Sequence, residues 1–73
     1  MASKYASFNA IILKLNFSIN IFYDRKDNVY ESRTSCVICH GTILSGKKTK
    51  VQDSKILIKS LIRSHLIRKH GVK

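Results

Sequence analysis

The chain has 73 residues, 44% of them hydrophobic, with neither proline nor tryptophan and with a formal net charge of +10. A chain this short forms one domain with a small core, and such domains commonly need a metal or disulfides to fold. The apolar run at residues 10–13 ends at Lys14. It is too short for a signal sequence or a membrane span, which argues against a membrane protein and favours an intracellular one.

The positive charge is concentrated in the second part of the chain. Residues 1–32 hold four Lys or Arg against three acids, a net charge of +1. Residues 33–73 hold ten Lys or Arg against Asp53 alone, a net charge of +9. This density favours a polyanion as partner, most simply nucleic acid. The alternative is a basic surface that only keeps the domain soluble.

Two strands joined by a turn are predicted in the first half. Residues 1–9 either fray or add to a strand. Over residues 13–21 apolar and polar side chains alternate strictly, which predicts a half-buried strand. Residues 24–28, with the sequence DRKDN, predict a charged turn. Residues 29–33 then return as a second strand, so that the two form a hairpin.

A helix is predicted for the C-terminal part. Asp53 or Ser54 can cap its first turn, and Gly71 suits its C-terminal cap. One face of this helix is apolar because suitable residues recur at helical spacing: Ile58, Leu61, Ile62, His65 and Leu66. Before it, residues 36–39 form a Cys-x-x-Cys turn, residues 43–44 a short strand or turn, and residues 45–50 a lysine-rich loop.

Two cysteines and two histidines have the spacing of a metal site. Cys36 and Cys39 are followed by His65 and His70 in the pattern C-x2-C-x25-H-x4-H. Zn²⁺ takes thiolate sulfur and imidazole nitrogen as four tetrahedral ligands. The two histidines are about 140° apart around an ideal helix, so sharing one ion requires either that the last turn tightens or widens or that His70 reaches from just past the helix end. The pattern predicts a structural zinc site.

Other uses of the cysteines remain open. Residues 36–40 read C-x-x-C-H, which matches the attachment signature of a c-type haem. The β-type pattern before it and the lack of an export signal argue against haem. A redox Cys-x-x-Cys lacks the βαβ pattern of its usual scaffold, and a disulfide would close only a very small loop. His40 is an alternative ligand in place of His70 if the helix end frays.

The order of strand, Cys-x-x-Cys turn, basic loop and helix ending in His-x4-His resembles the BED-type zinc finger, a Cys2His2 relative. The matching stretches are TSCVICHGTILS and LIRSHLIRKHG, and the resemblance covers residues 30–71. The gap between the cysteine turn and the helix histidines exceeds the roughly 12 residues of the common finger. The resemblance implies DNA binding and core aromatics before the first cysteine, a role for Phe22 and Tyr30. The usual tryptophan is missing.

We therefore expect a small α+β zinc-stabilised domain, with an N-terminal β-hairpin and a C-terminal α-helix. Residues 1–12 are set apart as an N-terminal segment and residues 13–71 as the zinc-finger-like domain. No paired carboxylates and no open zinc position are present in the pattern, so no enzyme is expected. A short chain with one finger is typical of accessory factors of viruses and mobile elements.

The expected function is nucleic-acid binding, with DNA ahead of RNA, because the aromatic side chains are expected in the core rather than exposed for base stacking. A eukaryotic or viral factor of this kind would act in the nucleus. The candidate contacts are basic residues of the loop and helix: Lys47, Lys48, Lys50, Lys55, Lys59, Arg63, Arg68 and Lys69. The alternative is a protein-interaction module that forms a homodimer through the edge of the strand at residues 13–22.

Overall fold

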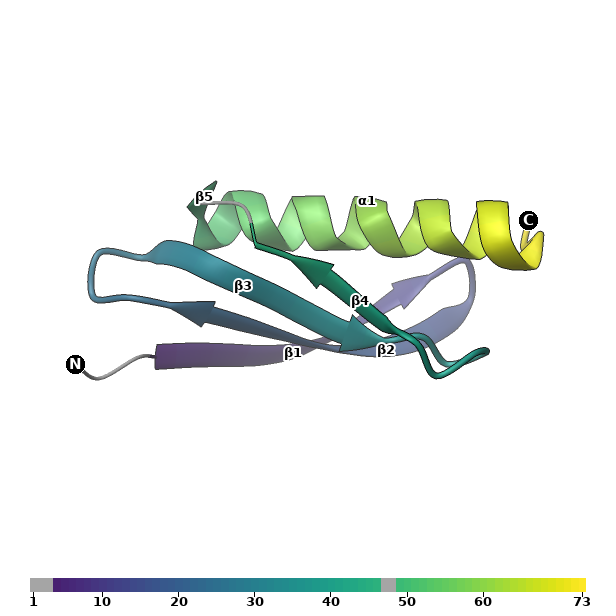
Figure 1. Cartoon of the computed structure of the whole chain (residues 1–73), viewed down its shortest axis with the longest axis horizontal. Helices are drawn as coiled ribbons and strands as arrows, with labels where there is room; N and C mark the ends of the chain where they lie inside the picture. The colour runs from purple at the N-terminus through teal and green to yellow at the C-terminus, as the bar shows by residue number, and fades with distance from the viewer. Residues whose placement is uncertain (1–3, 47–48) are drawn as a thin grey trace.

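The computed structural model describes residues 4–46 and 49–73. A long helix lies along one face of an antiparallel sheet (Figure 1), so the predicted α+β class is confirmed. The strands are paired in the order β1-β2-β3-β4, and β5 pairs with β3. In chain order the elements are β1 (Lys4–Ile12), β2 (Leu15–Tyr23), β3 (Asn28–Ser35), β4 (Thr42–Ser45), β5 (Thr49–Lys50) and α1 (Val51–His70).

The first hairpin contains residues 4–9, for which fraying or addition to a strand was expected, and they belong to a strand, β1. β1 pairs with β2 along its whole length, from Lys4 opposite Tyr23 to Ile12 opposite Leu15. The strand predicted to begin at residue 13 begins two residues later, because Leu13 and Lys14 form the turn with φ of 51° and 69°. Two-residue hairpin turns with positive φ at both positions are of type I′ and favour Asn-Gly, Asp-Gly or Gly-Gly. The Leu-Lys pair carries no such signal.

The second hairpin has the predicted turn. The Asp24 carboxylate accepts hydrogen bonds from the backbone N–H groups of Lys26 and Asn28, at 2.8 and 3.0 Å. These bonds, that of Asn28 first, hold the pKa of Asp24 below its ordinary value. β2 therefore has β1 on one side and β3 on the other. Residues 19–23 are paired on both sides, so this part of the edge that we expected to be free at residues 13–22 is not available for pairing with another chain.

The core lies between β2 and α1. Phe17 and Ile19 from β2 are fully buried, as are Ile58, Ile62 and Leu66 from α1. Burying an aliphatic or aromatic side chain of this size contributes about 1.5–3 kcal/mol each, so this layer fixes the helix on the sheet. The helical repeat predicted from the sequence is confirmed by these residues.

The predicted core roles of Phe22 and Tyr30 are wrong. Phe22 alternates with the buried Ile21 and so points to the opposite face of the sheet. The register of β2 and β3 shifts at Phe22, and Tyr30 is 47% exposed beside it. The aromatic side chain at the centre of the core is Phe17.

The helix begins earlier than the predicted caps. Lys50 is the N-cap residue and makes no side-chain capping bond. Ser54 is instead buried, with its hydroxyl 3.3 Å from that of Ser32. At the other end the predicted cap is confirmed: Gly71 has a φ of 62° and donates its N–H to the Ile67 carbonyl, while Val72 donates to Leu66. This cap holds the last turn of α1 in place.

Candidate metal centre

The two cysteines are presented by a tight turn between β3 and β4. The Cys36 N–H donates to the Gly41 carbonyl at 2.8 Å, and the His40 N–H donates to the Cys36 carbonyl at 2.9 Å. The Ile38 N–H points to the Cys36 Sγ at 3.4 Å. Cys36 is buried and Cys39 is exposed, and both thiols are free. The backbone of this turn therefore aims both sulfur atoms at the end of α1.

The two histidines come from the last turns of α1. His65 precedes the buried Leu66, and His70 is the final helical residue before the Gly71 cap. Their rings meet edge to face with centroids 5.0 Å apart, and their Nε2 atoms are 3.3 Å apart. The five-residue spacing therefore does not keep the two imidazole rings apart.

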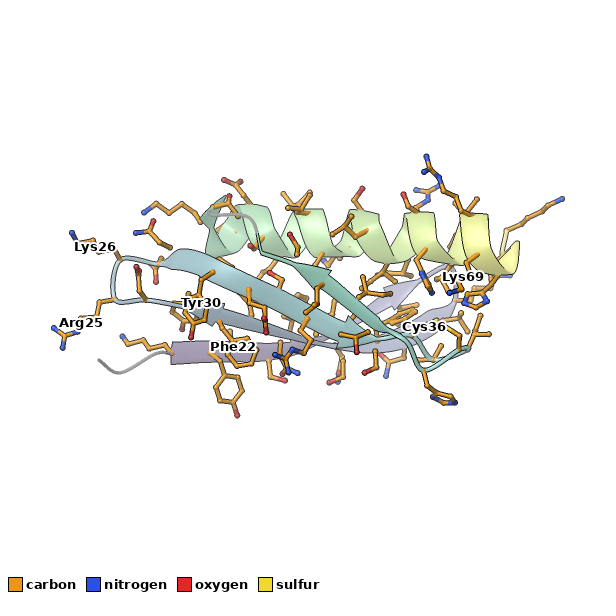
Figure 2. The ribbon with its side chains drawn as sticks, in the orientation of Figure 1. Phe22, Arg25, Lys26, Tyr30, Cys36 and Lys69 are labelled. Carbon is orange, nitrogen blue, oxygen red and sulfur yellow. The ribbon has the colours of Figure 1, made fainter. Side chains whose placement is uncertain are left out.

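The four side chains form one cluster. The Cys36 Sγ is 3.5 Å from the His70 Nε2, and the Cys39 Sγ is 3.6 Å from the His65 Nε2. All four ligand atoms lie within 4.8 Å of one another, so the cluster can hold a metal ion. Figure 2 shows Cys36 at the same end of the molecule as Lys69 in the last turn of α1.

His40 is not part of this cluster. It is exposed and follows Cys39 with a φ of 61°, while the histidine that joins the two sulfur atoms and His65 is His70. The structure therefore does not support the alternative in which His40 replaces His70 as a ligand. The helix extends to His70 and is closed by the Gly71 cap, so His70 stands beside the cluster.

The cluster favours the metal-binding protonation states of two of its ligands. Burial raises the pKa of the Cys36 thiol, but hydrogen bonds from Cys39 and Ile38 and the charge of Lys69 together hold it below its usual value. Burial lowers the pKa of His65, and the charges of His70 and Lys69 lower it further. Metal ions bind the thiolate and the neutral imidazole. Both shifts therefore favour metal binding near neutral pH.

The basic residues that were predicted to contact nucleic acid lie in several parts of the structure. Lys55 and Lys59 lie over the Phe8 ring of β1, with Nζ 5.4 and 5.9 Å from its centroid. Arg63 is exposed one turn further along α1. A hollow of about 380 Å³ opens beside them, lined by Ile11, Ile12, Leu13, Lys59, Ser60 and Arg63. These three basic side chains form a ridge along α1, next to β1.

The other basic candidates do not join this ridge. The Lys50 Nζ donates to the Lys26 carbonyl and to the Asn28 side chain, at 2.9 and 3.2 Å, and so fastens the second hairpin. Arg68 and Lys69 are exposed in the last turn of α1, beside the cysteine and histidine cluster. The remaining two candidates, Lys47 and Lys48, lie outside the described residues.

Comparison with protein-family models, with curated proteins and with solved structures found no match to this chain. The similarity to the BED type therefore rests on the ligand pattern, and what the structure supports is a cluster compatible with a Cys2His2-like site. Within residues 4–46 and 49–73, no helix has the length and apolar character needed to cross a membrane.

Proposed function

We propose that the cluster is a structural zinc site. The observation that carries this proposal is the spacing of the ligand atoms. Zn–S bonds of about 2.3 Å and Zn–N bonds of about 2.0–2.1 Å at tetrahedral angles require S···N separations near 3.6 Å and an N···N separation of about 3.3 Å. The corresponding distances here are 3.5, 3.6 and 3.3 Å.

A zinc ion in this cluster would have four protein ligands and no position for water or substrate. Sites of that kind stabilise a fold, whereas catalytic zinc keeps one position open. Here the ion would join the turn after β3 to the end of α1, two segments that the chain separates by 25 residues. We accordingly propose a binding protein rather than an enzyme.

We propose further that the domain binds nucleic acid, with DNA as the main candidate, in the nucleus if the host cell is eukaryotic. The support is electrostatic: residues 33–73 carry a net charge of +9, and Lys55, Lys59 and Arg63 form one ridge on α1. Phosphate contacts by such side chains release counterions from DNA. A helix also fits the major groove, where base edges can be read.

The test of DNA binding removes two charges from the ridge. The variant Lys59→Ala/Arg63→Ala should weaken binding to duplex DNA and lower the slope of log K against log salt by about 1.8, since each phosphate contact contributes about 0.9. The matched control, Arg25→Ala/Lys26→Ala, removes two exposed cations from the tip of the second hairpin (Figure 2). Equal slopes in the ridge variant and the unmodified protein would exclude contact through the ridge.

A second candidate function is pairing with another chain, and one observation favours it. The nine residues of β1 pair with β2 on one side, and no other described strand lies on the far side. An exposed edge of this length is a template for strand addition. Light scattering on the purified protein separates a monomer from a dimer. A dimer that persists at high salt, with no retardation of DNA, would favour this function over the first.

A further inference from the structure

The face of the sheet opposite α1 presents a row of aromatic side chains. Tyr5, Phe22 and Tyr30 come from β1, β2 and β3, with ring centroids 5.8 Å apart between the first two and 6.4 Å apart between the last two. Tyr5 is 65% exposed and Tyr30 is 47% exposed. Figure 2 shows Phe22 and Tyr30 on the side of the sheet that faces away from the helix. We refer to these three residues as the aromatic row.

A guanidinium group extends the aromatic row toward the middle of the sheet. The Arg33 Cζ lies 5.4 Å from the centre of the Phe22 ring. The Arg33 Nε donates to the Glu31 carboxylate at 3.0 Å, which fixes the guanidinium group over that ring. Planar guanidinium groups stack on bases as aromatic rings do. The charge of Glu31 is balanced by Arg33.

A polar hollow adjoins the aromatic row on the same face. It has a volume of about 400 Å³ and is lined by Asn16, Ser18, Asn20, Arg33, Thr34, Ser35 and Val37. Asn20 lies opposite Arg33 in the register of β2 and β3. Amides, hydroxyls and a guanidinium group supply both donors and acceptors, which are what hydrogen bonding to the edges of bases requires.

We infer that this face binds the unpaired bases of a single-stranded nucleic acid. Bases stack on exposed aromatic side chains of a sheet, and their edges then reach neighbouring polar groups. The occupant must also suit the charge of the chain, and a polyanionic backbone is complementary to a net charge of +10. Duplex DNA hides the faces of its bases in the stack, so a duplex does not satisfy this surface.

This surface is distinct from the ridge of Lys55, Lys59 and Arg63. The helix α1, which carries the ridge, covers one face of the sheet (Figure 1), and Phe22 and Tyr30 lie on the other face (Figure 2). The exposure of the aromatic row also removes the reason for ranking DNA above RNA, because that ranking assumed that the aromatic side chains were buried. RNA and single-stranded DNA expose the same base faces, and the experiment separates them.

The experiment measures binding of short labelled strands to the metal-loaded full chain by fluorescence anisotropy, using oligo-uridine, oligo-thymidine and a duplex. Tyr5→Ala and Tyr30→Ala should each weaken binding of a single strand by about 5- to 150-fold, the range for loss of one base–aromatic stack. Tyr5→Phe and Tyr30→Phe should retain the affinity, because the ring remains. Oligo-deoxyuridine, which differs from oligo-uridine only by the absence of the 2′-hydroxyl, identifies the sugar that is preferred.

The chain also supplies its own spectroscopic signal. It has three tyrosines and no tryptophan, and two of the tyrosines belong to the aromatic row. Stacked bases should therefore quench most of the tyrosine emission when a single strand binds. Quenching should be lost in the double variant Tyr5→Ala/Tyr30→Ala.

Ile56→Ala is the matched control for the alanine variants, because it removes a side chain that is 70% exposed on α1 and not aromatic. Unchanged affinity and emission in the aromatic variants would overturn the inference. The inference would also be overturned if the aromatic variants converted a dimer into a monomer without changing the affinity for nucleic acid. The aromatic row would then be a contact between two copies of the chain. Failure of the ridge variant Lys59→Ala/Arg63→Ala would refute DNA contact through α1 and leave the aromatic row standing.

Discussion

Replacing His70 by alanine gives the sharpest test of the metal centre, because the chain contains a matched control. The His70 Nε2 lies 3.5 Å from the Cys36 Sγ and 3.3 Å from the His65 Nε2, so its removal opens one of four corners. His40 stands directly after Cys39 but is exposed and outside the cluster. His40→Ala and His70→Ala each remove one imidazole, but only His70→Ala removes a proposed metal ligand.

The size of the effect follows from the number of ligands. Structural zinc sites bind with about 10–16 kcal/mol near neutral pH. An equal share for each of four ligands is about 2.5–4 kcal/mol, which corresponds to a loss of affinity of roughly 70- to 900-fold. We expect His70→Ala to lose affinity in this range and His40→Ala to stay within about threefold of the unmodified protein.

The assay is a titration of metal-stripped protein with Co²⁺, followed by visible absorption and then by competition with zinc. Tetrahedral coordination gives Co²⁺ intense d–d bands, whereas octahedral coordination gives weak ones. The unmodified protein and His40→Ala should show the intense bands, and His70→Ala should show them weakened and at higher metal concentration. If His40→Ala lost the bands and His70→Ala kept them, the ligand set would be wrong.

Three further outcomes are expected. Ile62→Ala, at a fully buried position, should lower the free energy of unfolding by about 2–5 kcal/mol, whereas Ile56→Ala, at a 70% exposed position on the same helix, should change it by less than about 0.5 kcal/mol. Thermal unfolding followed by circular dichroism tests this pair, and equal losses would contradict the packing. Gly71→Ala should lower the free energy of unfolding by about 1 kcal/mol, because position 71 has a positive φ. It should also weaken Co²⁺ binding, since the cap holds the last turn, and an unchanged titration would show that the cap does not support the metal site. In metal-free protein the pKa of His65 is lowered by burial, so the unfolded chain binds the proton more tightly. Stability should then be full above about pH 6.5 and fall as the pH drops through the lowered pKa, and urea unfolding should lose this pH dependence in His65→Gln.

The short-range patterns of the sequence determined several features that the structure confirms. The buried face of α1 follows from a helical repeat of apolar residues, and Gly71 ends the helix because glycine accepts a positive φ without strain. The C-x2-C and H-x4-H spacings each hold two of the candidate metal ligands within one local turn or helix end. These features depend on neighbours a few residues apart, so the sequence was sufficient for them. That the two pairs meet within 4.8 Å is a tertiary contact between segments separated by 25 residues.

Other features depend on which segments pair, and only the tertiary structure decided them. The Leu13 and Lys14 turn has no turn residues, and its positive φ values are imposed by the pairing of β1 with β2 along nine residues. Phe22 lies on the same face of β2 as the polar residues that alternate along this strand, so the sequence did indicate its exposure. Tyr30 lies at a register shift, which reverses the alternation of faces along β3. The aromatic row exists because the pairing of three successive strands brings Tyr5, Phe22 and Tyr30 side by side. The turn at residues 24–28 indicated the pairing of β2 with β3, but no turn residue indicated the pairing of β1 with β2.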